Sequence, residues 1–154
     1  MPTPSLLERH PLLVHLEPAQ LERVARAGAI ESYNSGETIV ADGTLGDALF
    51  LILSGQTAVH RAGTTFATLA AGDLFGEMSL VEPVARSASV TAMSATFVFR
   101  LPHDALRTLI SEDAQVASVL LVQIVKVLSE RLRRANQMLS SVDVLADWLA
   151  GSMV

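Results

Sequence analysis

The sequence predicts a mainly β, α+β fold: a double-stranded β-roll or jelly roll with helices before it and a long helix after it. Seven of the nine glycines lie between positions 36 and 76, where they separate short runs of β-prone residues. Short strands at such spacing are typical of rolls and sandwiches rather than of parallel sheets. On either side of this region, apolar residues recur at helical spacing. The 154 residues are expected to form one domain, which buries about two-thirds of its unfolded surface.

Residues 1–28 predict short N-terminal helices. Leu21 and Val24 stand at helical spacing, and Pro11 and Pro18 separate the helical runs. Proline begins a helix but interrupts one that is already formed. We therefore expect several short helices before the roll instead of one long helix.

Residues 29–101 predict the roll itself. β-branched and aromatic residues gather in short runs between glycine-containing turns. The predicted strands are Glu37–Ala41, Ala48–Leu53, Thr57–Arg61, Thr65–Ala70, Ser89–Ala92 and Thr96–Arg100. Residues 72–90, within this region, form a segment (the cassette) that contains Gly72, Gly76, Glu77 and Arg86.

Residues 102–139 predict two helices. Pro102 suits a helix start, so we expect a first helix over His103–Ile110. Ser111 is followed by two acidic residues and suits the cap of a longer helix over residues 113–139.

The long helix carries more apolar residues than one buried face requires. Val116–Leu128 has only three polar residues among thirteen, whereas a helix on a domain surface needs a single apolar stripe. We expect one face to pack on the roll and another on a second copy of the chain, which predicts a homodimer. The last segment, residues 140–154, predicts a separate short amphipathic helix over Val142–Leu149 with Trp148.

The charge of the chain narrows the classes of function. A formal net charge of −5 argues against a nucleic-acid-binding surface, which needs clustered Lys and Arg, so we expect no direct DNA binding. Arg131, Arg133 and Arg134 form a local basic cluster beside Glu130. This cluster indicates a solvated helix face, with contact to DNA or an acidic partner as the alternative.

The sequence shows no membrane or export signal. Its apolar runs are too short and too interrupted to cross a bilayer, and no basic segment precedes an apolar core near residue 1. The chain has no cysteine, which excludes disulfides and thiolate chemistry. We therefore expect a cytoplasmic protein without a membrane span.

The sequence offers no catalytic or metal-binding constellation. His10, His15, His60 and His103 are scattered, and no two of them stand at ligand spacing. A nucleophile motif and a second carboxylate at fixed spacing from Glu77 are also missing. We expect a protein that is not an enzyme and that needs no metal or cofactor.

Gly72–Leu80 and the Arg86 after it carry the functional prediction. Gly72 and Gly76 allow the backbone to approach an anion closely, and amides of a turn or helix start point donors at it. Arg86, nine residues after Glu77, supplies a planar charged fork for phosphate oxygens. Since Glu77 repels phosphate, its expected partner is a neutral donor such as a sugar hydroxyl. The set predicts a nucleotide pocket.

Five motifs occur in order along the chain. They are Gly36–Ile39, Gly46–Phe50, Ser54–Gly55, Phe75–Leu80 and Arg86–Val90. Together they resemble the cyclic nucleotide-binding domain of bacterial catabolite activator proteins, cyclic-nucleotide-dependent kinases and cyclic-nucleotide-gated channels. The resemblance covers about residues 10–135 and departs from the family at Ala85, where many members carry proline.

The resemblance implies a β-roll flanked by helices, with the long helix after Pro102 acting as hinge and lid. Glu77 would bind the ribose 2′-hydroxyl and Arg86 the cyclic phosphate. Amides of the cassette glycine and of the two residues after the arginine would complete the phosphate cradle. The ligand-binding residues it implies are Phe75, Gly76, Glu77, Met78, Ser79, Arg86, Ser87 and Ala88.

The hydroxyl of Ser87 can add one hydrogen bond, either to the phosphate or to the base. Ser87 makes cAMP the favoured ligand over cGMP, because serine at this place resembles the bacterial cAMP regulators. Asn136, late in the long helix, reaches the purine if that helix folds over the pocket. The alternative is that Asn136 is a plain surface residue, and the same two interpretations apply to Arg131.

Each of the central residues also has a structural interpretation. Glu77 and Arg86 could form an ion pair with each other, and Gly76 could serve only as a turn residue. Asp47 could cap its own glycine-rich turn or support the cassette.

These inferences predict a sensor that binds a cyclic nucleotide and moves its C-terminal helices to control a protein partner. About 15 residues follow Leu139, so we expect no helix-turn-helix after the long helix. One alternative is a dimerisation or docking module of the same fold that has lost ligand binding. The other is the sensory fragment of a transcription regulator.

Overall fold

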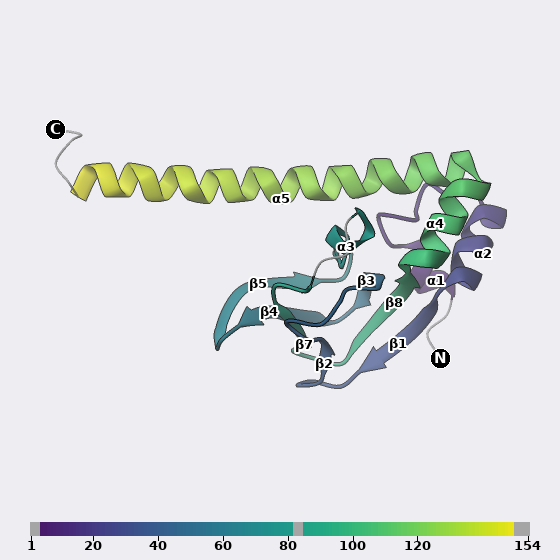
Figure 1. The fold of residues 1–154 in the computed structure, drawn as a ribbon, viewed down its shortest axis with the longest axis horizontal. Helices are drawn as coiled ribbons and strands as arrows, with labels where there is room; N and C mark the ends of the chain where they lie inside the picture. The colour runs from purple at the N-terminus through teal and green to yellow at the C-terminus, as the bar shows by residue number, and fades with distance from the viewer. Residues whose placement is uncertain (1–3, 82–84, 150–154) are drawn as a thin grey trace.

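The computed structural model describes residues 4–81 and 85–149, with side chains for residues 6–81 and 85–139. Figure 1 shows a roll of strands, a group of helices at one end of it, and a long helix that runs over the roll and beyond it. The predicted mainly β, α+β fold with N-terminal helices and a long C-terminal helix is confirmed.

Two four-stranded antiparallel sheets form the roll. The first contains, in spatial order, β1 (Ala29–Tyr33), β8 (Thr96–Pro102), β3 (Ala48–Ser54) and β6 (Leu74–Phe75). The second contains β2 (Thr38–Val40), β7 (Ser89–Ala92), β4 (Gln56–Arg61) and β5 (Thr64–Ala70). Strands distant in sequence, such as β1 and β8, therefore pair as neighbours.

The six strands predicted from the sequence are present, and the structure adds β1 and β6. β6 has only two residues, paired with Phe50 and Leu51 of β3. So short a strand leaves no alternation of polar and apolar residues for a sequence pattern to reveal. In β1 no residue is fully buried, so its pattern of hydrophobicity is equally weak.

β3 separates two hydrophobic cores. Its residues from Ala48 to Leu53 are all buried, because both faces of the strand are covered. Phe50 and Ile52 face the inside of the roll, whereas Leu49 and Leu51 pack under the helices. A continuous apolar run is the expected signature of a strand with two buried faces.

The helices at one end of the roll cover the core that contains Leu49 and Leu51. α1 (Pro4–Glu8) and α2 (Pro18–Ala27) are the short N-terminal helices that the prolines predicted. α4 (His103–Glu112) begins directly after Pro102, as expected, and buries Leu106 and Leu109 against the same core.

The predicted cap of the long helix is wrong. Ser111 lies inside α4, and Asp113 is the residue that caps α5 (Ala114–Leu149). The Asp113 carboxylate accepts hydrogen bonds from the backbone N–H groups of Gln115 and Val116, both at 3.1 Å. These bonds lower the pKa of Asp113, and Arg23 of α2 adds an ion pair at 2.7 Å. Ser111 has helical backbone, whereas Asp113 has the extended backbone that an N-cap residue requires.

The predicted boundary between a helix ending at residue 139 and a separate helix over Val142–Leu149 is also wrong. α5 runs without interruption from Ala114 to Leu149. The residues between the two predicted helices include neither glycine nor proline, so nothing in the backbone forces the helix to end there. The side chain of Trp148 lies outside the described side chains.

α5 divides its apolar residues between a buried and an exposed face. Val116, Leu120 and Ile124 are buried in the core under the helices. The exposed apolar side chains of its described part include Leu121, Val122, Val125, Leu128, Leu132, Met138 and Leu139. Within the described residues, no helix joins the length and apolar character that crossing a bilayer requires.

Candidate nucleotide-binding site

A cavity of about 530 Å³ lies between the roll, the β6–α3 turn and α5. α3 is the short helix Met78–Val81 that follows β6. The cavity is lined by Val40, Val59, Ala67, Leu69, Phe75, Gly76, Glu77, Met78, Ser79, Ala85, Arg86, Ser87, Ala88, Val90 and Arg131. Eight of the nine predicted ligand-binding residues therefore line one cavity, and Asn136 is the exception.

Gly76 does more than turn the chain. Its φ of +88° is a conformation that favours glycine, and a Cβ at this position would lie 2.4 Å from the carbonyl oxygen of Ala48. The absence of a side chain lets the turn press against β3. Gly76 thus sets where Glu77 and the start of α3 lie relative to the roll.

Arg86 is placed by its own backbone. Its N–H donates to the carbonyl of Thr44 at 2.7 Å, and its carbonyl accepts from the N–H of Gly43 at 2.8 Å. Its guanidinium lies 5.7 Å from the ring centroid of Phe50. Phe50 is in turn stacked on Phe75, with ring centroids 4.8 Å apart. A loop fixed at two points and a pair of aromatic rings therefore hold this cation.

The Arg86 side chain forms no ion pair with any carboxylate among the described residues. Asp47, the nearby candidate, instead pairs with Arg100 at 3.0 Å. Burial lowers the pKa of Arg86 from its ordinary value, although the residue stays charged at neutral pH. A half-buried guanidinium without a carboxylate gains from an anionic ligand, because removing a charge from water is costly.

Asp47 does not cap its own turn. Its carboxylate accepts from Arg100 on β8, and its carbonyl accepts from the N–H of His103 at 2.9 Å. It joins the loop before β3 to the end of β8 and the start of α4. Its negative charge also partly offsets the effect of burial on the pKa of Arg86.

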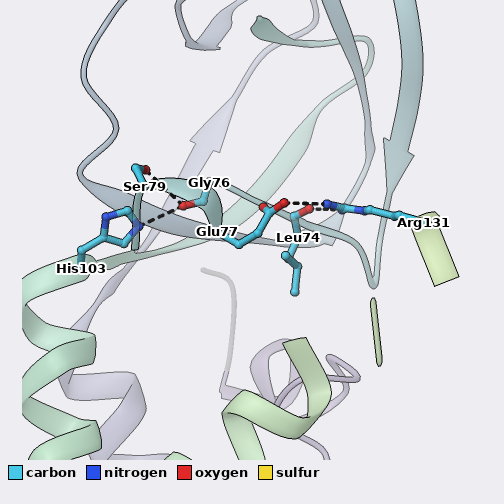
Figure 2. Close-up of polar contacts among 6 residues, drawn as sticks. All are labelled: Leu74, Gly76, Glu77, Ser79, His103 and Arg131. Carbon is cyan, nitrogen blue, oxygen red and sulfur yellow. Dashed lines mark hydrogen bonds and ion pairs between the residues drawn. The ribbon is translucent and has the colours of Figure 1, made fainter. Parts of the chain in front are cut away.

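Glu77 is paired with Arg131 of α5 and not with Arg86, so the predicted alternative of a Glu77–Arg86 pair is wrong. Arg131 Nη1 lies 3.3 Å from Glu77 Oε1, and the Glu77 side chain is only 13% exposed. Arg131 also donates through Nη2 to the carbonyl of Leu74 (Figure 2). The other carboxylate oxygen, Oε2, has no protein partner among the described residues.

The structure separates the two interpretations of the late α5 residues. Arg131 lines the cavity and contacts the cassette, whereas Asn136 is exposed and does not line it. The difference follows from helix geometry, because five residues advance a helix by about 7.5 Å and more than one full turn. In this conformation of the chain, Asn136 does not reach a base in the cavity.

His103 is a residue of the site region that the sequence interpretation missed. It is buried at the start of α4 and donates from Nε2 to the carbonyl of Gly76 at 3.0 Å. Burial lowers the pKa of His103, so the ring is neutral at neutral pH. The hydroxyl of Ser79 lies 3.5 Å from the same carbonyl. Figure 2 shows His103 and Arg131 on opposite sides of the Gly76–Glu77 turn.

No sequence signal pointed to His103, because its partner is a backbone atom 27 residues earlier. Among the described residues, no three His, Asp or Glu side chains come together as metal ligands would. That the protein needs no metal or cofactor remains a prediction.

Comparison with known proteins identifies the family to which this site belongs. The model of the family described as "Cyclic nucleotide-binding domain" matches residues 30–113, which include the cassette and Arg86. The chain belongs to the cyclic nucleotide-binding domain family. The family recognised from the five motifs is therefore confirmed.

Several curated relatives contain this domain within longer chains. A CRP-like cAMP-activated global transcriptional regulator of Mycobacterium tuberculosis is 27% identical over 142 residues, covering 89% of this chain and 62% of that protein. A cAMP-dependent protein kinase regulatory subunit of Aspergillus niger is 33% identical over 108 residues, covering 69% and 26%. Glutaminase 1 of Bradyrhizobium diazoefficiens is 34% identical over 142 residues, covering 90% and 22%. The chain spans less than two-thirds of each relative.

Solved structures agree on the fold of the cyclic nucleotide-binding domain. The catabolite activator protein of Thermus thermophilus matches with a TM-score of 0.71 and 30% identity, covering 86% of this chain and 63% of that one. The N-terminal domain of a transcriptional regulator from Streptomyces coelicolor matches with a TM-score of 0.67 and 27% identity, covering 87% and 94%.

Proposed function

We propose that this chain is a sensor domain that binds a cyclic nucleotide, cAMP in preference to cGMP, in the cavity beside the cassette. The observation that carries the proposal is the half-buried Arg86, which has no carboxylate partner among the described residues and lines a cavity that also contains Glu77. A ligand that satisfies both must present an anion and a neutral donor a short distance apart. A cyclic ribose phosphate does so.

The lining of the cavity supports one orientation of the ligand. The cyclic phosphate would lie on Arg86 and the amides around Gly76 and Ser87, and a ribose hydroxyl would donate to Glu77. Apolar side chains line the part of the cavity formed by β4 and β5, where Val59 and Leu69 offer a surface for the purine.

The Glu77–Arg131 pair is compatible with a bound sugar. A carboxylate accepts more than one hydrogen bond on each oxygen, and Arg131 uses only Oε1. A ribose hydroxyl could therefore donate to Oε2 while Arg131 stays in place. This arrangement would connect the ligand to α5 through one carboxylate.

Preference for cAMP rests on two observations. Ser87 stands at the place where serine resembles the bacterial cAMP regulators. The similar proteins from Mycobacterium tuberculosis and Aspergillus niger are named as cAMP-activated and cAMP-dependent, respectively. The part of the cavity proposed to hold the base is lined mostly by apolar side chains, which make no hydrogen bonds that distinguish adenine from guanine. We therefore expect the preference for cAMP over cGMP to be modest.

Isothermal titration with cAMP, cGMP and the linear nucleotide AMP tests the proposal. We expect cAMP to bind most tightly, at a dissociation constant of about micromolar or below, which corresponds to about −8 kcal/mol. Arg86→Ala should remove most of this binding and Arg86→Lys part of it, while Arg133→Ala, on the exposed surface of α5, serves as the matched control. Absence of heat with every cyclic nucleotide, for a folded protein, would contradict the proposal and favour the docking-module alternative.

We also propose that α5 pairs with a second copy of the chain. Leu121, Val125, Leu128 and Leu132 are all exposed and succeed one another at spacings of four, three and four residues. Alternating steps of three and four are the pattern of a coiled-coil seam. The seam lies on the part of α5 that the roll leaves uncovered.

Sedimentation velocity tests the dimer. Val125→Glu with Leu132→Glu should convert a dimer to a monomer, because both substitutions place charge in the seam. Met93→Glu, at an exposed apolar position on the roll, should leave the dimer intact. A wild-type monomer at high concentration would contradict the dimer and leave the nucleotide proposal untouched.

The output is proposed to be a protein partner or an attached domain that responds to movement of α4 and α5. Similar regions occur in proteins named as a transcriptional regulator, a kinase regulatory subunit and a glutaminase, so the same module serves different outputs. A sensory fragment of a transcription regulator is the corresponding alternative for this chain. That the protein is cytoplasmic, is not an enzyme and does not itself bind DNA remains a prediction.

A further inference from the structure

One face of α4 holds both ends of α3. His103 and Arg107 are four residues apart and therefore lie on the same side of the helix. His103 donates to the carbonyl of Gly76 at 3.0 Å, and Arg107 donates through Nη2 to the carbonyl of Leu80 at 2.9 Å. Gly76 lies just before α3 and Leu80 lies within its final residues. Two side chains of α4 thus bracket the short helix of the cassette.

The two contacts hold one backbone carbonyl before α3 and one near its end, and the Gly76 carbonyl also lies 3.5 Å from the Ser79 hydroxyl. A helix of four residues leaves its last carbonyls without intrahelical partners, so Arg107 acts as a cap for Leu80. The His103 bond fixes the orientation of the Gly76–Glu77 peptide. Because a trans peptide is planar, the N–H of Glu77 points away from the carbonyl that His103 holds.

Packing and backbone contacts reinforce the connection between α3 and α4. Leu80 packs against the core that contains Leu106 and Leu109 of α4. The N–H of His103 itself donates to the carbonyl of Asp47, which anchors the first turn of α4 beside the cassette. Only Asp113 separates the end of α4 from the start of α5. A shift of α4 should therefore displace the N-terminal end of α5.

We propose that His103 and Arg107 are positioning residues that make α3 and α4 move as one unit, so that ordering of the cassette by a ligand is passed to α5. The inference rests on the proposed function, since it concerns the response of the helices to a bound cyclic nucleotide. A ligand that contacts Arg86 and Glu77 does not compete for the carbonyls of Gly76 and Leu80. Ligand binding therefore leaves both bonds available, which is the property that a mechanical link requires.

The connection differs from the one through Arg131. Arg131 contacts Glu77, a proposed ligand contact, so its removal is expected to affect binding itself. His103 and Arg107 hold only backbone oxygen atoms of the cassette, and His103 does so on the side away from Arg131 (Figure 2). Their removal should therefore alter the response to the ligand more than the affinity for it.

Distance measurements between two spin labels test this proposal, and the absence of cysteine allows labels to be introduced without background. Thr64 on β5 and Ser129 on α5 are exposed and suit Thr64→Cys and Ser129→Cys. Double electron–electron resonance of the labelled wild type should show a change in distance when cAMP is added. The His103→Leu, Arg107→Met double variant should lose most of that change, while its dissociation constant stays within about tenfold.

Rescue variants separate the hydrogen bonds from simple packing. His103→Gln, whose amide N–H replaces the imidazole donor, and Arg107→Lys should restore most of the distance change. Asp104→Asn is the matched control, because it breaks the 3.1 Å ion pair with Arg107 and leaves the bond to Leu80 in place. It should behave as wild type.

Three results would decide against the proposal. A folded double variant with the full cAMP-induced distance change would overturn it, as would a wild type that binds cAMP without any distance change. If His103→Leu fails to fold, Arg107→Met alone, at a half-exposed side chain, provides the test, and a full distance change there also overturns the link. Failure of the wild type to bind any cyclic nucleotide would instead contradict the proposed function.

Discussion

The two charged residues that line the cavity differ in the partners that the protein already gives them. Arg86 lies over Phe50 and has no carboxylate partner among the described residues. Glu77 is largely buried and is already paired with Arg131 of α5. Arg86 can therefore accept an anion, whereas Glu77 is connected to the helix that would respond to binding.

This difference suggests that Arg86 contributes mainly to the affinity for the ligand and Glu77 mainly to the response of α5. An unpaired cation gains most from a ligand, because an anion replaces water around a half-buried charge. A carboxylate that is already paired gains less, but any change in its position is passed to α5 through Arg131. Substitutions of Arg86, Glu77 and Arg131 test whether the two charged residues contribute in this unequal way.

Arg86→Ala should have the largest effect on binding. Removing one partner of a hydrogen-bonded charge pair typically costs about 2–5 kcal/mol, so we expect cAMP affinity to fall by about 100-fold or more. Isothermal titration provides the measurement, and thermal unfolding without ligand should show a stable protein. A loss of less than about tenfold, about 1.4 kcal/mol, would contradict the role of Arg86 as the phosphate anchor.

Glu77→Gln should have the next largest effect. Hydrogen bonds to a charged group are worth about 1.5–3 kcal/mol, so a loss of about 30-fold in cAMP affinity is expected. Comparison of cAMP with 2′-deoxy-cAMP sharpens the test. The wild type should prefer cAMP clearly, and the variant should distinguish the two ligands poorly. An unchanged preference would show that Glu77 does not contact the 2′-hydroxyl.

Arg131→Met should weaken cAMP binding only moderately, by up to about tenfold. The substitution keeps an extended apolar side chain but removes the groups that hold Glu77 and the Leu74 carbonyl. Glu77 then loses its fixed position, and the ligand must order it. Arg133→Met is the matched control on the exposed side of α5. A loss as large as that of Arg86→Ala would contradict the proposed difference between Arg86 and Glu77.

Substitution of His10, which contacts the cassette residue Asp73, should have the smallest effect, and it should alter the pH dependence of stability. His10 is buried, donates from Nε2 to the Asp73 carbonyl at 3.0 Å, and accepts the N–H of Leu12 on Nδ1 at 3.1 Å. A second proton on Nδ1 would displace Leu12. Burial lowers the pKa of His10 below its ordinary value of 6.5.

The sign of this effect follows from proton binding. Well above pH 6.5, His10 is neutral in both the folded and the unfolded chain and contributes no pH dependence. Below that pH the unfolded chain binds a proton that the folded chain resists, so the free energy of unfolding falls as the pH falls, by at most about 1.4 kcal/mol per pH unit. His10→Gln should make the loss of stability between about pH 7 and pH 5.5 smaller. Urea unfolding at several pH values measures it, and an unchanged pH dependence would exclude His10 as its source.

Sequence patterns predicted those parts of the molecule whose signal is local. Six of the strands, the short N-terminal helices and the start of α4 follow from glycine, proline and apolar spacing within a few residues. The cavity lining by residues 75–79 and 86–88 was also predicted, because these residues lie close together in the sequence. The position of Arg86, however, depends on its backbone hydrogen bonds to Gly43 and Thr44. β6 was missed because two residues carry no periodicity, and the end of the long helix was misjudged because no residue there marks it.

The sequence by itself determined which groups could hold a nucleotide: glycine for close approach of the backbone, a guanidinium and a carboxylate at fixed spacing. Tertiary structure alone decided which partners these groups have. Glu77 pairs with Arg131 of α5, and the Gly76 carbonyl accepts a hydrogen bond from His103 of α4. Asp47 pairs with Arg100, so Arg86 has no carboxylate partner among the described residues. The physical reason is that the covalent chain determines which residues are neighbours within a turn. Which charged residues of distant segments form pairs depends on how the helices and strands pack.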